Sequence, residues 1–281
     1  MGKYTFENFK NVYEFEETLR KRPVNPHFDI SNGSARTSGA DWFQTKNYTE
    51  ADELLDKGWN TKIDEVRGVL ENFSSTVAVK HRKQIFDYVG FMPSVPRAIM
   101  GYPQAMINYT KRDELEKQRT KHIVFNNTAN CGTDGDQLLK SGLTVLKLAM
   151  ILDKANVRTK IDMIPFFARR GESYLGCSVT IKDYRQSFNY LKMAYPIANP
   201  SFFRRHGFRY LETQSGDSWS AWTGTYGSSI GNDDTDRDTE GFREYAGLKK
   251  DDVIYISYKD CENAGFDVEK LMANIGLGKK N

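Results

Sequence analysis

Apolar residues recur at helical spacing in the stretch NYTEADELLDKGW, which begins at residue 47. Leu54 and Leu55 fall on one face, Thr49 is placed as the N-cap, and Gly58 is placed as the stop. Residues 61–73 show the same spacing of apolar positions. The pattern therefore predicts two consecutive helices in this part of the chain.

Strand-like and helix-like patterns alternate through the middle of the chain. Short apolar runs with β-branched residues predict strands, and leucines at helical spacing between Asp136 and Asn156 predict a long helix that ends in a left-handed residue. The predicted elements, from strand to final helix, are 121–127, 136–156, 157–168, 173–183, 187–195, 252–258 and 267–275. This order predicts an α/β sheet with at least one right-handed crossover.

Composition shifts along the chain predict three regions. Residues 1–40 contain prolines, glycines and small polar residues, which favour an irregular N-terminal arm. Residues 41–115 predict helical additions followed by a Pro/Gly connection at 89–109, whose apolar residues predict a buried segment packed on the main sheet. Residues 116–281 predict the α/β core, with a long loop at 214–245.

Overall composition is typical of a globular protein. Of 281 residues, 39% are hydrophobic and 27% are charged, and the formal net charge is +3. We expect no membrane span, because Lys147 interrupts the longest apolar run, and no secretory signal, because the first residues contain no apolar stretch. The three cysteines form no CxxC pair, and the four histidines have no metal spacing, so a structural zinc site is not expected. We therefore expect a protein of the cytoplasm.

Four segments carry a resemblance to a known family. They are FQTKNYTEADELLDKGW from residue 43, GFMPSVPRAIMGYPQAMINY from residue 90, GLTVLKLAMILDKANVRTKI from residue 142 and RRHGFRYLE from residue 204. Together they resemble a family of uncharacterised tailed-bacteriophage proteins that look like variants of the von Willebrand factor A (vWA) fold. The resemblance covers roughly residues 40–260. It implies a phage origin and a vWA-like (Rossmann-like) sheet flanked by helices, with helical N-terminal additions, but no activity.

The resemblance also directs attention to the loop after the first core strand. In a working vWA domain this loop reads Asp-x-Ser-x-Ser and holds Mg²⁺, whereas the matching positions here are Asn126, Thr128 and Asn130. Amides bring no charge, although Asp134 and Asp136 lie just beyond and could compensate in part. The alternative, which we favour, is that the loop side chains satisfy backbone groups and the next helix. We expect no cofactor, with Mg²⁺ as the exception to test.

Basic and aromatic residues interleave in residues 202–210. This pattern suits single-stranded nucleic acid, because bases stack on aromatic rings and cations neutralise phosphates. The candidate contacts are Arg169, Arg170, Arg204, Arg205 and Arg209. In the alternative interpretation, the phenylalanines belong to the core and the arginines pair with Asp183, Glu212 or the acidic carboxyl-terminal region.

Two further groups of residues suggest a site. Trp219, Trp222 and Tyr226 lie in a glycine-rich segment and predict an exposed protein-contact surface. Cys131 lies near a helix N-terminus, which can activate a thiol, and would need His122 as its base. Recognisable catalytic motifs are otherwise lacking in the sequence, so we lean towards a non-enzymatic protein.

The sequence therefore predicts a phage-encoded macromolecule-binding protein in the host cytoplasm. We favour a protein partner, from host or phage, bound by the 126–136 loop rim together with residues 216–242. The alternatives are a single-stranded nucleic-acid-binding protein and a structural component of the virion. The oligomeric state is left open, and no membrane partner is expected.

Overall fold

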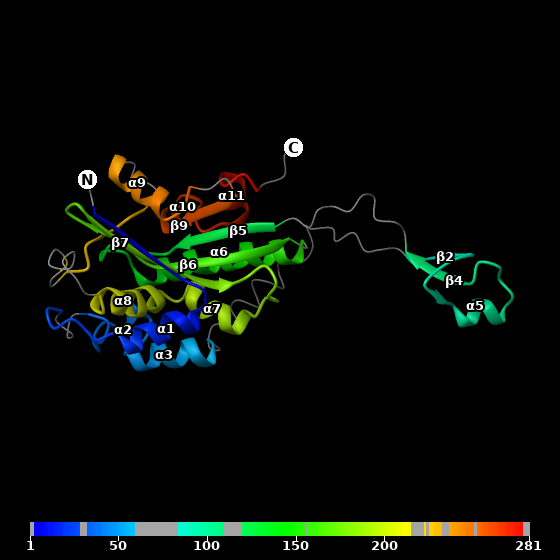
Figure 1. Ribbon diagram of the computed structural model, residues 1–281, viewed down its shortest axis with the longest axis horizontal. Helices are drawn as coiled ribbons and strands as arrows, with labels where there is room; N and C mark the ends of the chain where they lie inside the picture. Colours follow the sequence, from blue (N-terminus) through cyan, green and yellow to red (C-terminus); the bar gives the residue numbers. More distant parts are fainter. Residues whose placement is uncertain are drawn as a thin grey trace.

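The computed structural model describes residues 3–28, 33–59, 84–109, 120–155, 157–214, 222, 225–231, 236–249 and 252–277. These residues form an α/β fold with a mixed central sheet flanked by helices (Figure 1). The strands of this sheet are β1 (Lys3–Phe9), β5 (Thr120–Asn126), β6 (Arg158–Arg170), β7 (Ser173–Lys182), β8 (Ser228–Ser229) and β9 (Val253–Ser257). Their order is β1-β7-β6-β5-β9, and β8 pairs with β6.

Helices cover both faces of this sheet. They are α1 (Val12–Lys21), α2 (Ala40–Phe43), α3 (Tyr48–Lys57), α6 (Gly135–Lys154), α7 (Tyr190–Ala198), α8 (Phe208–Glu212), α9 (Arg237–Tyr245), α10 (Tyr258–Asn263) and α11 (Val268–Asn274). A π-helical segment, η1 (Phe202–Gly207), runs directly into α8. The unit β5-α6-β6 joins two parallel neighbours, so the predicted crossover is confirmed as a connection between parallel strands.

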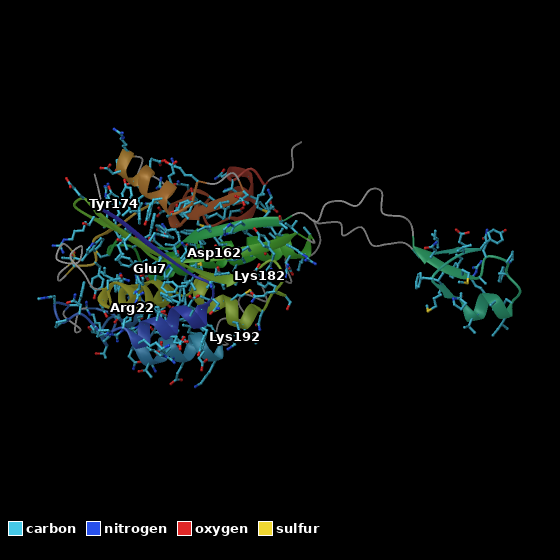
Figure 2. All side chains as sticks on the ribbon, viewed as in Figure 1. Glu7, Arg22, Asp162, Tyr174, Lys182 and Lys192 are labelled. Atoms are coloured by element: carbon cyan, nitrogen blue, oxygen red, sulfur yellow. The ribbon has the colours of Figure 1, made fainter. Side chains whose placement is uncertain are left out.

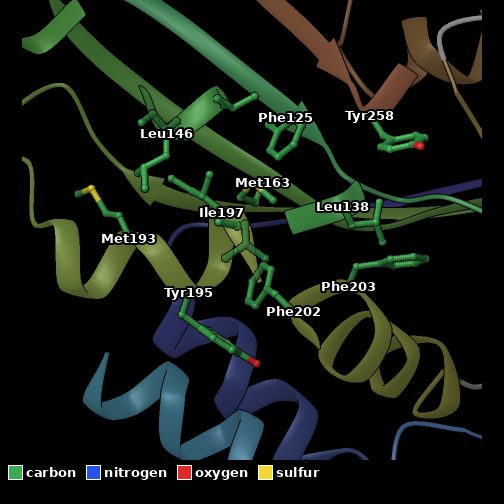
Figure 3. Close-up of a cluster of buried hydrophobic side chains, with 14 of the residues drawn as sticks. Phe125, Leu138, Leu146, Met163, Met193, Tyr195, Ile197, Phe202, Phe203 and Tyr258 are labelled. Atoms are coloured by element: carbon green, nitrogen blue, oxygen red, sulfur yellow. The ribbon is translucent and has the colours of Figure 1, made fainter. Parts of the chain in front are cut away.

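Alternation along the central strands explains the two-sided core. Ile123 and Phe125 pack with α6 and α7 on one face, whereas Val124 packs with Phe242 of α9 on the other. Adjacent residues of β6 divide in the same way, because Phe166 belongs to the first cluster and Phe167 stacks on Phe242 at a centroid distance of 4.8 Å. Figure 3 shows the first cluster closed by side chains of α7 and η1.

The N-terminal region is more regular than the sequence predicts. Residues 1–40 were expected to form an irregular arm, but Lys3–Phe9 is an edge strand that pairs in parallel with β7, and Val12–Lys21 is a helix. Arg22 and Glu7 join the two elements by a pair of 3.1 Å hydrogen bonds (both labelled in Figure 2). Phe9 and Phe15 belong to the main core, so this region is an integral part of the α/β body.

The elements predicted around residue 50 are confirmed in part. The helix α3 is present and Gly58 follows its last residue, as expected, but the capping side chain is that of Asn47 rather than Thr49. The oxygen of Asn47 accepts a hydrogen bond from the backbone N–H of Glu50 at 2.8 Å. The helix expected at 61–73 and the stop expected at Asn156 lie outside the described residues.

Residues 84–109 form a separate small sheet, which we call the hairpin module. It contains β2 (Gln84–Asp87), β3 (Met92–Pro93), α5 (Val95–Ile99) and β4 (Met106–Tyr109), in the strand order β2-β4-β3 (Figure 1). The prediction that 89–109 is buried against the main sheet is wrong. The segment is apolar, as expected, but its side chains are exposed, with Ile99 at 80% and Val89 at 77%.

The expected 214–245 loop also contains regular structure. Its last residues form α9, which begins after Asp236, and the side chain of Asp236 accepts a hydrogen bond from the Thr239 backbone at 3.0 Å. Ser228 and Ser229 form β8, which pairs with Ala168 and Arg169. These two short elements place residues 225–231 beside the carboxyl end of β6.

Candidate functional site

The loop after β5 lies at the carboxyl edge of the sheet, where α/β folds place their ligand sites. Asn126 is fully buried, and its amide donates to the Ile230 carbonyl and the Tyr255 hydroxyl at 2.8 Å each. Its oxygen accepts from the backbone and the hydroxyl of Thr128, at 3.0 and 2.6 Å. Both side chains are therefore engaged in holding the loop in shape.

The other three residues of the expected metal loop make separate contacts and do not face a common point. The oxygen of Asn130 accepts from the backbone and the hydroxyl of Ser229, at 3.2 and 3.0 Å, and so fastens β8 to the loop. Asp134 is the N-cap of α6, and Asp136 accepts from the Gln44 amide at 3.3 Å. Both carboxylates are exposed and belong to the start of the helix.

These residues do not fit a divalent cation. Asn126 and Thr128 contribute no charge, and a hard dication prefers several carboxylates. Arg169 and Lys259 line the cavity beside the loop and already pair with the carboxylates of Asp236 and Glu262, so these carboxylates are engaged. Within the described ranges, His, Cys, Asp and Glu side chains form no group of three that could hold a metal ion.

An aromatic pocket opens next to this loop. It has a volume of about 710 Å³, and its walls come from α2, the β5 loop, β6, η1, α8 and β8. The aromatic lining residues are Trp42, Phe43, Phe166, Phe167, Phe203, Phe208 and Tyr226. Polar atoms at the edge come from Arg36, Asn130, Cys131 and two serines. A mainly apolar hollow with a few polar groups is the usual composition of a binding site.

A second, polar cavity adjoins the aromatic pocket. It has a volume of about 360 Å³ and shares Ala129, Asn130, Ser228 and Ser229 with the pocket. Its remaining lining includes hydroxyl side chains together with the two cations, from Thr128, Thr133, Arg169, Ser257, Tyr258 and Lys259. This chemistry suits a negatively charged group. We call the aromatic pocket and the polar cavity together the rim cavity.

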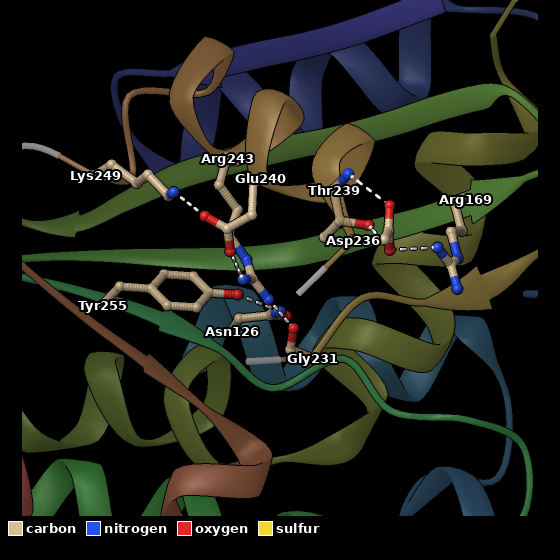
Figure 4. A network of polar contacts seen from close by, with 9 residues as sticks. All are labelled: Asn126, Arg169, Gly231, Asp236, Thr239, Glu240, Arg243, Lys249 and Tyr255. Carbon is tan, nitrogen blue, oxygen red and sulfur yellow. Dashed lines mark hydrogen bonds and ion pairs between the residues drawn. The ribbon is translucent and has the colours of Figure 1, made fainter. Parts of the chain in front are cut away.

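A network of polar contacts fixes the strand-side wall of the rim cavity (Figure 4). Arg169 pairs with Asp236 at 2.7 Å, and Asp236 in turn caps α9. Arg243 of the same helix donates to the Gly231 carbonyl and pairs with Glu240 at 2.8 Å. Through Gly231, α9 holds the loop that carries Ser228 and Ser229. This wall is therefore supported by α9, a helix that the sequence does not predict.

Two of the five arginines proposed for nucleic-acid contact are buried. Arg204 donates to the carbonyls of Trp42 and Thr133 and lies 3.8 Å from the Trp42 ring centroid. Arg205 is also fully buried, and burial lowers the pKa of Arg204 to about 9 and of Arg205 to about 10. The prediction that Arg204 and Arg205 contact nucleic acid is therefore wrong, because neither guanidinium can reach a phosphate.

The other three arginines are partly exposed but dispersed. Arg169 lines the polar cavity, and Arg170 donates to the Thr225 hydroxyl at 3.1 Å. Arg209 lies 3.7 Å from Glu212 and over the Tyr48 ring, so the alternative pairing with Glu212 holds for this residue. The basic segment thus does not form one continuous exposed strip.

The expected aromatic contact surface is not assembled as predicted. Trp222 is only 2% exposed and packs edge-on against Phe166, so it is a core residue. Tyr226 is half-buried and lines the aromatic pocket, and its hydroxyl donates to Glu212 at 2.7 Å. Trp219 lies outside the described residues. Of the three, Tyr226 contributes directly to the rim cavity.

The catalytic dyad of Cys131 and His122 that the sequence suggested is not formed. His122 is near the start of β5, where its Nε2 lies 2.6 Å from an Asp162 oxygen, whereas Cys131 follows the other end of the strand. Cys131 is exposed at the edge of the aromatic pocket. Trp42 and Phe43, which sequence reasoning missed, form the opposite wall. The sequence feature that could have identified them is the pair of adjacent aromatic residues just after the segment of glycines and small polar residues that ends at Ala40.

No helix in the described residues is long and apolar enough to span a bilayer. Neither the curated proteins nor the solved structures include a match to this chain. Residues 2–279 match the family model described as Domain of unknown function (DUF7192). Because that match extends over nearly all of the chain, the protein belongs to the DUF7192 family.

Proposed function

We propose that this chain is a non-enzymatic, phage-encoded protein that binds a protein partner through the rim cavity. The observation that carries the proposal is the pairing of an aromatic pocket with a cation-lined cavity across the shared residues Asn130 and Ser229. Such a hollow suits an apolar or aromatic side chain that has an acidic group beside it. Aromatic residues and arginine are the usual anchors of protein interfaces.

The finer fold assignment belongs to the same proposal. A vWA-like core, with its metal loop degenerated to Asn126-x-Thr128-x-Asn130, agrees with the position of this loop after a central parallel strand. Loss of the metal would leave the loop edge as a polar platform for binding. The chain would then act in the host cytoplasm or as part of the virion, and would need no cofactor.

Capture from bacterial lysate tests the proposal when a pocket-blocking variant is compared with a matched control. Ser228 is exposed and lines both cavities, so Ser228→Trp fills the rim cavity without disturbing the core. Ser187 is an exposed serine in a different hollow, and Ser187→Trp is the control. We expect Ser228→Trp to lose at least nine-tenths of the captured partner, while Ser187→Trp retains it.

The same experiment examines the nucleic-acid alternative. Nuclease treatment and a salt series separate the two partners, because binding to phosphates falls steeply with salt. Equal capture by wild type and Ser228→Trp would refute the rim cavity as the site. Capture that disappears with nuclease and with rising salt would favour nucleic acid held by the partly exposed arginines, Arg169 and Arg170.

A further inference from the structure

The hairpin module has almost no core of its own. Ile107, with 9% exposure, is the sole buried hydrophobic residue among the described side chains of 84–109. A unit of this size is normally stabilised by disulfides, metals or association, and this one contains no cysteine. Arg97 gives limited internal support, since it lies between the rings of Phe86 and Tyr102 at 4.2 and 4.7 Å.

Exposed large hydrophobic side chains are concentrated in the module. Nine of the twelve exposed large hydrophobic side chains in the described part of the chain belong to it. The most exposed are Ile99 at 80%, Val89 at 77% and Met100 at 71%. Concentrated exposure of this kind marks an interaction surface, whereas isolated exposed apolar residues do not.

The charge of the module restricts what covers this surface. Asp87 and Arg97 are its only charged residues, so its net charge is zero. Nucleic acid and anionic lipid headgroups are recognised by clusters of basic residues, which the module lacks. The fitting occupant is therefore an apolar hollow in a protein.

The same chain contains such a hollow in the aromatic pocket. The pocket is lined by Phe166, Phe203, Phe208 and further rings, and its volume of about 710 Å³ is large enough for several aliphatic side chains. Met and Ile side chains pack well against aromatic rings, and sulfur–ring contacts add to the attraction. Ile99 and Met100 are adjacent and prominent, so they are the natural residues to enter it.

Chain geometry disfavours docking of the module into its own pocket. Ten residues join Tyr109 of the module to Thr120, the first residue of β5, whereas the pocket lies beyond Asn126, the last residue of that strand. Ten residues reach at most about 33–36 Å. Doubling back along the seven residues of β5 would use about 23 Å of that reach, before any turn is made. A second copy imposes no such constraint.

We propose that the hairpin module of one copy inserts Ile99 and Met100 into the aromatic pocket of a second copy of this chain. The inference rests on the proposed function and names the partner of the rim cavity. The hairpin module and the aromatic pocket are different surfaces, so a contact between them on two copies is heterologous. Such contacts close the assembly either as a reciprocal pair between two copies or as a ring. Self-association of this kind is also what a structural component of the virion requires.

Disulfide trapping in the full chain tests the contact directly. Cys131 is the only exposed cysteine of the three, and it lies at the edge of the pocket. Ile99→Cys, oxidised with diamide, is expected to give a disulfide-linked dimer that disappears when Cys131→Ser is added. Lys57→Cys on α3, with a side chain 71% exposed, is the matched control and is expected to form no disulfide-linked dimer.

Light scattering tests the association without a cross-link. The wild-type chain is expected to have at least twice the mass of one copy, and the double variant Ile99→Asp/Met100→Asp is expected to fall to the mass of one copy. Both side chains are exposed, so these changes leave the α/β body folded. Ser228→Trp, which blocks the pocket, should have the same effect as the double variant.

Several results would overturn the inference. A wild-type chain that is monomeric at high concentration would do so, as would a larger species that the double variant leaves intact. A Cys131-dependent disulfide within one chain would assign the module to its own pocket. A monomer that floats with neutral phosphatidylcholine vesicles only when Ile99 is intact would assign the module to a lipid surface.

The inference and the proposed function fail in different ways. Monomeric protein whose partner capture is still abolished by Ser228→Trp would leave the rim cavity as a site for another protein. Loss of self-association in the double variant but not in Ser228→Trp would leave the module as a contact surface and exclude the pocket as its acceptor.

Discussion

Replacement of Arg205 by methionine is expected to destabilise the fold by about 3 kcal/mol, through four hydrogen bonds that no other side chain replaces. The guanidinium of Arg205 donates to the carbonyls of Ser34, Arg36 and Thr45 at 2.8–2.9 Å, and to the Thr45 hydroxyl at 2.6 Å. It also lies 4.2 Å from the Phe43 ring centroid. These contacts tie residues 34–45 to η1.

The magnitude follows from two opposing effects. Hydrogen bonds from a charged donor contribute about 1.5–3 kcal/mol each, so the four bonds are worth several kcal/mol in total. Methionine removes the cost of keeping a charge away from water, which is also several kcal/mol. The acceptors stay buried and lose their donor, so the balance remains unfavourable. Arg185→Met is the control, because Arg185 is exposed and its replacement should cost less than about 1 kcal/mol.

Urea unfolding, followed by circular dichroism, measures both variants. Limited trypsin digestion adds a local readout, because release of residues 34–45 exposes the bond after Arg36. We expect faster cleavage there in Arg205→Met and no change in Arg185→Met. A loss of less than about 0.5 kcal/mol with unchanged cleavage would refute the reasoning, since surface substitutions have effects of that size.

Three further predictions concern packing and pH. Gly142→Ala is expected to cost about 1–3 kcal/mol in urea unfolding, because a β-carbon there would lie 2.3 Å from the Ala198 Cα where α6 crosses α7; an unchanged midpoint would contradict this close crossing. Burial lowers the pKa of His206 to about 3, so the unfolded chain binds a proton near pH 6.5 that the folded chain excludes. Stability should therefore fall by about 2 kcal/mol from this residue between pH 7 and pH 5, and the stability difference between wild type and His206→Phe should change with pH by that amount rather than stay constant. Burial alone would raise the pKa of Asp162, but hydrogen bonds from His122 and Lys160 lower it overall, so its contribution is present at neutral pH and is lost as the pH falls through the lowered value. Asp162→Asn should reduce stability at pH 7 and lessen the loss in acid, and equal acid sensitivity in both proteins would argue against the pairing.

Local patterns along the chain determined several elements correctly. The leucines of α6 recur every three or four residues and Asp134 caps the helix, so both its existence and its start are encoded within a few turns. The parallel pairing of β5 with β6 was predictable in the same way, since a strand, a helix and a strand of suitable length imply a crossover. The polar loop after β5 was also identified, because short polar residues interrupt two strongly apolar stretches.

Elements that depend on distant partners were missed or misjudged. β1 mixes aromatic with charged and polar residues, and its pairing partner is β7, more than 160 residues away along the chain. Arg204 and Arg205 looked like solvent-exposed cations, yet carbonyls contributed by the N-terminal region make their burial possible. Without those carbonyls a buried guanidinium would be strongly unfavourable, so no local pattern can indicate it.

In the rim cavity and the hairpin module, too, some features follow from the local sequence and others only from the tertiary structure. The sequence by itself determined that residues 126–130 are polar and that residues 89–109 are apolar, because side-chain chemistry is local. Only the tertiary structure decided that Trp42, Phe208 and Tyr226 meet beside that loop, and that Ile99 and Met100 are exposed rather than in the core. The physical reason is that hydrophobic burial is non-directional. Apolar residues specify that they will be covered, whereas the fold of the whole chain decides which surface covers them.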